Sequence, residues 1–138
     1  MKLNVVLSED RFITGYNNIL LQNLANESQT IINNSCNEIL AMNILDYVDD
    51  EHITQLLGLF ISKLRLGGKL YISGINLDTV ARGLLGKTLA EKEFNQIIKN
   101  IKSLRSRKTV IDLLKSANLL IETAITKGNI YEITATRQ

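Results

Sequence analysis

The chain has 138 residues, of which 45% are hydrophobic and 22% are charged, and its formal net charge is +2 at pH 7. This length and composition indicate one folded domain, residues 1–138, and exclude an intrinsically disordered chain. The single cysteine, Cys36, excludes an internal disulfide framework and a cysteine-based zinc site. We expect no other metal site either, because the acids in residues 46–51 lack a recognisable ligand spacing.

No apolar run reaches the roughly 18 residues that cross a membrane, and the opening MKLNVVLSEDRF lacks the pattern of a secretory signal. We therefore expect a cytoplasmic protein with no membrane partner. Basic residues gather in KNIKSLRSRK, residues 99–108, but no aromatic residues alternate with these charges to stack on bases. A solvated helix end is the simpler interpretation, so we do not expect nucleic acid as a partner.

The first half of the chain predicts four strands and one long helix. Residues 3–7 are a short aliphatic and β-branched run, which is typical of a strand buried on both faces. Residues 16–21 and 30–33 indicate short strands, and residues 39–42 indicate a buried one. Residues 50–65 predict a helix, because apolar residues recur there at helical spacing and acids stand at the start, where they suit the helix dipole.

The second half of the chain predicts a strand, three helices and a closing pair of strands, at residues 69–73, 78–85, 89–104, 109–117, 119–126 and 129–136. Gly67 and Gly68 stand directly after the long predicted helix, where a left-handed C-cap is favoured. Lys127 and Gly128 separate the two closing strands and predict an antiparallel hairpin with glycine at a positive φ.

This order of elements predicts an α/β fold with a parallel crossover between residues 37 and 74. Three segments carry a closer resemblance: ILAMNILDYV, KLRLGGKLYIS and INLDTVARGLLGKTLAEKEFNQII. They resemble the fourth strand, the turn into the fifth strand and the following region of class I S-adenosylmethionine (SAM)-dependent methyltransferases. The resemblance implies a Rossmann-like methyltransferase sheet, mostly parallel with a C-terminal antiparallel hairpin, and here shortened between strands 2 and 4.

The resemblance also implies where SAM, the family's cofactor, would lie. The segments KLNVVLS and GYNNI are similar to the family's first strand and to the start of its second strand. Carried onto this chain, the residues around the nucleoside are Leu7, Ser8, Asn17, Asn43 and Ile44.

Two of the family's functional features are missing from this sequence. Glycines after the first strand let the backbone approach the ligand, and this chain has Val6, Leu7 and Ser8 there. An acid after the second strand accepts hydrogen bonds from the ribose, and this chain offers Asn17, Asn18 or Gln22. Binding of SAM is therefore doubtful from the sequence, and so is enzyme activity.

For other candidate residues a structural role competes with a functional one. Asn43 suits either a ligand contact or loop hydrogen bonding, and Asp46 suits either a site acid or a helix cap. His52, the only histidine, is expected in the first turn of the long helix, where a partly packed surface position is favoured over a general base. Cys36 has no histidine near it in sequence and so gives little support for a nucleophile.

Three hypotheses follow. The first is a degenerate methyltransferase-like protein with lost or weak cofactor binding, which acts as a protein-interaction or structural subunit and has a protein partner or self-associates. The second is a minimal active SAM-dependent methyltransferase for a small or sugar-type substrate, with no catalytic residue identified. The third is a polyanion-binding protein that uses residues 99–108.

Overall fold

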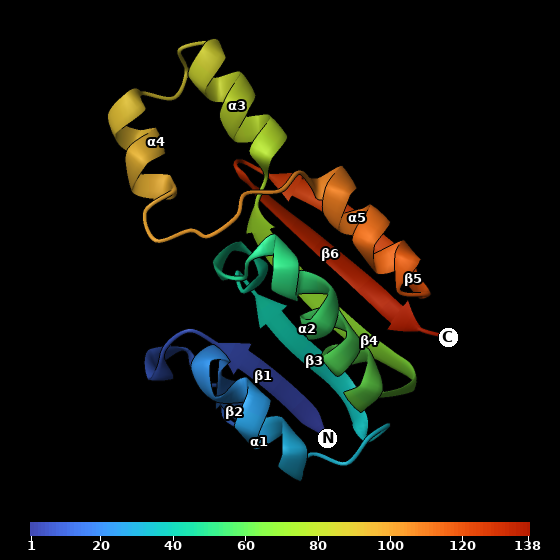
Figure 1. Cartoon of the computed structure of the whole chain (residues 1–138). Coiled ribbons are helices and arrows are strands. Elements are labelled where there is room, and N and C mark those ends of the chain that lie inside the picture. The colour runs from blue at the N-terminus through green and yellow to red at the C-terminus, as the bar shows by residue number, and fades with distance from the viewer.

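The computed structural model describes all residues, 1–138, and has one six-stranded sheet (Figure 1). The strands are β1 (Lys2–Val6), β2 (Asn17–Leu20), β3 (Cys36–Met42), β4 (Leu64–Ile75), β5 (Leu119–Lys127) and β6 (Ile130–Arg137). The helices are α1 (Leu24–Glu27), α2 (Asp50–Lys63), α3 (Leu77–Leu85), α4 (Glu91–Ile97) and α5 (Arg107–Ser116). Short 3-10 turns are η1 (Glu9–Arg11), η2 (Leu21–Asn23), η3 (Ser28–Thr30) and η4 (Leu45–Tyr47). No helix has the length and apolar character needed to cross a bilayer.

The strand order is β2-β1-β3-β4-β6-β5. The first four of these strands are parallel, and β6 runs antiparallel between β4 and β5. The predicted fold class, a mostly parallel α/β sheet with a C-terminal antiparallel hairpin, is confirmed. Only α1 and its flanking turns lie between β2 and β3, so no further strand pairs with the outer edge of β2.

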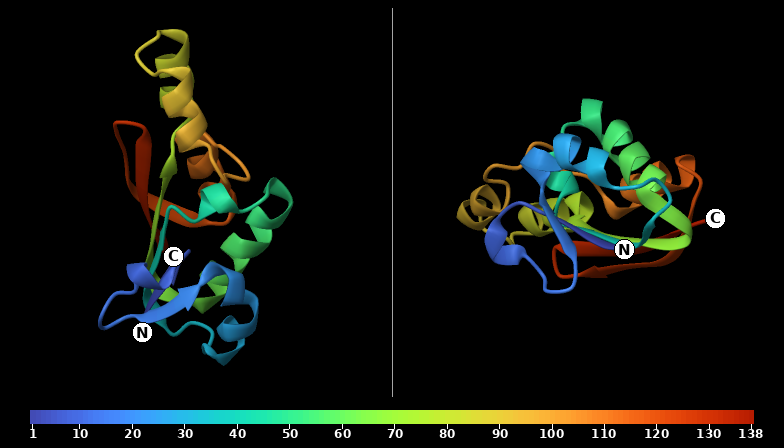
Figure 2. Two further views of the ribbon diagram at one scale, coloured as in Figure 1. Left: turned by 90° about the vertical axis from the view of Figure 1, so that its left-hand side faces the viewer. Right: turned by 90° about the horizontal axis from the view of Figure 1, so that it is seen from below.

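The hydrophobic core lies between the sheet and a single layer of helices. Alternate residues of β3 and β4, such as Ile39 and Ile72, face this layer and are almost fully buried. Phe60 of α2 and Leu114 of α5 pack into the same core. Helices α1, α2 and α5 therefore cover one face of the sheet, and no helix lies on the opposite face (Figure 2).

The opposite face carries paired polar side chains. Glu38 lies 3.9 Å from the Lys2 ammonium and accepts a hydrogen bond from the Tyr16 hydroxyl. On the neighbouring strands, Lys69 lies opposite Glu38 in register and 3.2 Å from Glu122. These cross-strand pairs satisfy charged and hydroxyl groups of this face, and its other polar side chains are solvated by water, as in sheets with one face in contact with solvent.

The open face follows from the short connection between β1 and β2. Because β2 and β3 flank β1 on opposite sides, right-handed crossovers place the β1–β2 connection on the face away from α1 and α2. Residues 7–16 make this connection with only the η1 turn. Asn4 holds it against the sheet, since its Nδ2 atom donates to the Arg11 carbonyl at 3.1 Å and to Asn18 Oδ1 at 2.9 Å.

Three sequence-based predictions of local structure are wrong. Residues 30–33 form no strand, because η3 ends there and the Ile31 carbonyl accepts a hydrogen bond from buried Lys63 at 2.8 Å. The helix predicted over residues 89–104 is only α4, and Asn100 has a φ of 67° that interrupts any continuation. The Gly67-Gly68 pair is no helix cap: α2 ends at Lys63, and both glycines lie inside β4, where the register with β3 shifts.

Two glycines provide a matched test of this fold. A Cβ atom on Gly68 would lie 2.9 Å from the carbonyl oxygens of both Arg65 and Cys36, whereas one on Gly58, in α2, would meet nothing within 4 Å. We expect Gly68→Ala to lower the free energy of unfolding by about 1–3 kcal/mol, because backbone atoms must move. Gly58→Ala should raise it by about 0.5–1 kcal/mol, because alanine favours the helix. Urea denaturation followed by circular dichroism measures both, and equal effects of the two substitutions would contradict the β4 geometry.

Candidate functional site

The strand order places a ligand crevice at one edge of the sheet. From β1 the chain passes to β2 at one side of β1 and then returns to β3 at the other side, so the direction in which strands are added reverses at β1. In open α/β sheets, such a reversal marks the position where ligands bind, outside the carboxyl ends of the strands. The residues that directly follow β1, β2 and β3 therefore define the candidate site.

A pocket of about 370 Å³ lies at this position, and we call it the carboxyl-edge pocket. It is lined by Leu7, Leu21, Gln22, Tyr47, Val48, Asp49, His52 and Lys102. These residues come from the ends of β1 and β2, from η4 and the start of α2, and from the segment after α4. The pocket thus joins parts of the chain that are far apart in sequence.

Leu7 and Ser8 take different positions at the end of β1. Leu7 is half-buried and lines the carboxyl-edge pocket. Ser8 is exposed, and its hydroxyl donates to Asp10 within the η1 turn. The chain therefore leaves β1 through the η1 turn, and residues 7–10 contain no glycine.

The structure does not bring Asn17 to the other expected site residues. Asn17 begins β2 and pairs with Leu3, so it lies toward the amino edge of the sheet. The Asn18 side-chain amide is hydrogen-bonded within the chain: its Oδ1 accepts from Asn4 Nδ2 and from the Ile13 N–H, and its Nδ2 donates to the Ile13 carbonyl. Gln22 follows β2 and lines the pocket.

Asn43 and Ile44 follow β3 but face different surroundings. Asn43 has a left-handed φ of 60°; its backbone N–H donates to the Ser73 carbonyl at 2.9 Å, and its Oδ1 lies 3.1 Å from the Ser73 hydroxyl. These contacts join the carboxyl ends of β3 and β4. Ile44 is fully buried in the core and leaves no exposed side-chain surface for a ligand.

Asp46 is a buried carboxylate in η4, directly before the pocket residue Tyr47 in the sequence. It is 2% exposed, and its Oδ2 accepts a hydrogen bond from the Ile75 N–H at 2.9 Å. Its Oδ1 and the buried Tyr131 hydroxyl have no hydrogen-bond partner, and both oxygens point toward Gly74. Burial raises the pKa of Asp46 above its ordinary value, against the lowering effects of the Ile75 N–H and Arg105.

Arg105 fastens the α3–α4 excursion, residues 76–105, to the site. Its guanidinium is 5% exposed and donates to the carbonyls of Leu45 and Val48 at 2.8 and 3.0 Å, and to Asp50 at 2.8 Å. The Lys102 N–H donates to the Asp46 carbonyl at 2.9 Å, which fixes the backbone of Lys102 beside the pocket. The segment after α4 thus contributes Lys102 to the lining of the carboxyl-edge pocket.

His52 and Asp49 lie at the mouth of the pocket. Nδ1 of His52 is 3.8 Å from Asp49 Oδ2, and the two side chains are 62% and 50% exposed. Tyr47 lines the same pocket, and its hydroxyl makes no hydrogen bond within the chain. Cys36 begins β3 at the amino edge and is fully buried, so it cannot reach this site. No three His, Cys, Asp or Glu side chains come together to hold a metal ion.

Sequence reasoning missed Lys102, Val48 and Arg105 as residues of this region. Lys102 and Arg105 belong to a basic stretch that is interpreted from sequence alone as a solvated helix end. Only their contacts with η4, across more than fifty positions of sequence, reveal their place.

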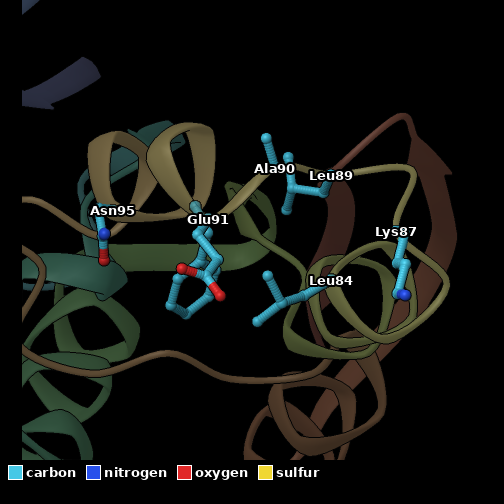
Figure 3. Close-up of a pocket in the computed structure, with 7 residues that line it drawn as sticks. Leu84, Lys87, Leu89, Ala90, Glu91 and Asn95 are labelled. Atoms are coloured by element: carbon cyan, nitrogen blue, oxygen red, sulfur yellow. The ribbon is translucent and has the colours of Figure 1, made fainter.

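A second hollow, of about 570 Å³, lies between α3 and α4 (Figure 3). Its lining includes Leu84, Leu89, Ala90 and Phe94, with Glu91 and Asn95 at the α4 side. It is contained within the excursion, which projects beyond the sheet (Figure 1). It therefore receives no residue from the carboxyl ends of β1, β2 or β3.

The environment of Asp46 predicts a pH-dependent stability. Its raised pKa means that the folded protein holds this proton to a higher pH than the unfolded chain does. The stabilisation is fully present below the ordinary value of 3.8 and is lost as the pH rises through the folded-state pKa. We expect the free energy of unfolding of Asp46→Asn, relative to that of the natural protein, to be higher at pH 8 than at pH 4.

Urea denaturation at the two pH values measures this difference. The matched control is Asp112→Asn, which removes an exposed carboxylate on α5. A constant difference between Asp46→Asn and the natural protein would contradict the buried, incompletely hydrogen-bonded carboxylate.

Comparison with known proteins supports the fold. No protein-family model and no curated protein matches the sequence. A SAM-dependent methyltransferase from Archaeoglobus fulgidus superposes with a TM-score of 0.67 at 15% identity, over 96% of this chain and 74% of that one. A SAM-dependent methyltransferase from Mesorhizobium loti gives 0.63 at 16% identity, over 98% and 79%.

An O-methyltransferase family 2 protein from Planctomyces limnophilus, solved in complex with apigenin, gives a TM-score of 0.66 at 16% identity. The chain is covered over 99% of its length but spans only 49% of that protein. At such identities the likeness shows the fold alone. The chain therefore has a class I SAM-dependent methyltransferase-like fold.

Proposed function

We propose that this chain is a methyltransferase-fold protein that has lost, or only weakly retains, SAM binding and acts as a protein-interaction or structural subunit. The observation that carries the proposal is the end of β1, where Leu7 and Ser8 lead into the η1 turn. A nucleoside held by backbone amides needs glycines or a helix N-terminus at this point. Residues 7–10, where the chain leaves β1, contain no glycine, and the three-residue η1 turn is not an α-helix.

The lining of the carboxyl-edge pocket supports the same proposal. The Leu7 side chain occupies space that a glycine would leave to the ligand. Gln22 stands where a carboxylate would hold the ribose, and an uncharged amide gives a weaker hydrogen bond than a charged acceptor. Both changes act against tight binding of SAM.

An interaction role is supported by apolar surface on the excursion. Leu85 of α3 is 84% exposed, and Leu77 on the same helix is 39% exposed. The excursion is rigidly based, because Asn76 and Arg105 form a β-bridge and Leu77 N–H donates to the Arg105 carbonyl at 3.0 Å. A firmly anchored projection with exposed leucines suits contact with a protein partner or with a second copy of this chain.

The alternative is a minimal active methyltransferase for a small or sugar-type substrate. One observation favours it: the carboxyl-edge pocket persists at the switch point and keeps polar side chains from Gln22, Tyr47 and Asp49. Methyl transfer depends mainly on positioning the acceptor in line with the sulfonium, so a dedicated base is not obligatory.

Titration calorimetry with SAM and S-adenosylhomocysteine tests the loss of cofactor binding. We expect no binding tighter than millimolar, because the backbone cradle is filled by side chains. Micromolar binding that is abolished by Tyr47→Ala, but kept by Asn17→Ala at the far edge of the sheet, would overturn the proposal in favour of the active enzyme.

Sedimentation velocity tests self-association through α3. We expect a concentration-dependent dimer whose affinity falls at least tenfold in Leu85→Glu, because a carboxylate cannot be buried in an apolar contact. Ile32→Glu is the control, since Ile32 is 76% exposed but lies outside the excursion. A monomer at every concentration would exclude self-association and leave a different protein as the partner.

A further inference from the structure

The carboxyl-edge pocket continues into a second, apolar hollow between α1 and α2. This hollow has a volume of about 630 Å³ and shares Leu21, Val48 and His52 with the pocket. We call it the α1–α2 groove. The two helices that form its walls lie on the covered face of the sheet (Figure 2). The two hollows therefore adjoin at these three residues, and we call them together the depression.

The depression changes from polar to apolar along its length. Aliphatic side chains make the floor of the groove: Leu21, Leu24, Val48, Leu56 and Leu59. Ala25, Ser28, His52 and Gln55 complete the lining, and no Asp, Glu, Lys or Arg takes part in it. Apolar cavities of 300–1,000 Å³ with a few polar groups at one end are typical of small-molecule sites.

The charges at the polar end indicate the sign of a ligand's head group. Two lining residues of the carboxyl-edge pocket are close together: Oδ2 of Asp49 lies 3.8 Å from Nδ1 of His52. Lys102 forms no ion pair with any carboxylate of the chain. Tyr47 and Gln22 add side-chain donors that make no hydrogen bond within the chain. The Asp49 carboxylate also lines this end, beside His52, so the ammonium of Lys102 and these donors are the groups there that complement an anionic, hydrogen-bonding head.

We propose that the depression binds a small anionic amphiphile, with its aliphatic body in the α1–α2 groove and its carboxylate-type head near Lys102. This inference goes beyond the proposed function, because it names a ligand class and does not depend on SAM. Burial of the aliphatic body against the leucines supplies the affinity, and Lys102 supplies the preference for an anion.

Calorimetric titration with sodium decanoate, sodium octanoate and decylamine, without any nucleoside, tests the proposal. Each methylene removed from the tail should lower the affinity about fourfold, so octanoate should bind about sixteenfold more weakly than decanoate. Decylamine should bind several-fold more weakly than decanoate. Lys102→Gln should remove that preference, while Lys99→Gln, outside both hollows, should keep it.

Two alanines give a matched test of where the tail lies. Ala25→Phe places a ring in the α1–α2 groove from an exposed position on α1, and it should abolish decanoate binding. Ala90→Phe fills the hollow between α3 and α4 and should leave binding unchanged. Circular dichroism confirms that both variants fold. Absence of decanoate binding at millimolar concentration, an affinity independent of tail length, or retained binding in Ala25→Phe would each overturn the proposal.

Discussion

The structure depends on how the chain passes from β1 to β2. Right-handed crossovers put that connection on the face away from α2, and residues 7–16 are too few to build a helix there. The same segment ends the strand at which a methyltransferase presents its glycine cradle. One short connection therefore both leaves a sheet face without helices and puts the side chains of Leu7 and Ser8 directly after β1.

The open face remains compatible with a stable fold because its side chains differ from those of the core face. Glu38 and Glu122 each have a lysine partner across the strands, so water and neighbouring groups satisfy this surface. The residues at the intervening positions of the same strands are apolar, face the covered side of the sheet and pack against α2 and α5. The period of two along β3 and β4 thus separates a solvated face from a buried one in a two-layer protein.

The fold was predictable because its signals are local. The closing hairpin across Gly128, with its φ of 58°, and the helix that begins after Asp49 follow from turn chemistry and periodicity. The site was less predictable, because Lys102 and Arg105 reach η4 through tertiary contacts that leave no periodic pattern. Asn17 illustrates the same limit: the resemblance aligns its segment with a functional strand, but only pairing in the sheet shows that it stands at the opposite edge from Leu7.

The short connection between β2 and β3 accounts for the α1–α2 groove beside the carboxyl-edge pocket. Helix α1 is a single turn, Leu24–Glu27, beside the fourteen residues of α2. A longer helix there would cover the aliphatic surface of Leu56 and Leu59, which instead lines a hollow that opens toward Leu21 and Val48. The short connection between β2 and β3 therefore leaves apolar surface beside the carboxyl-edge pocket, and Leu21 borders both hollows.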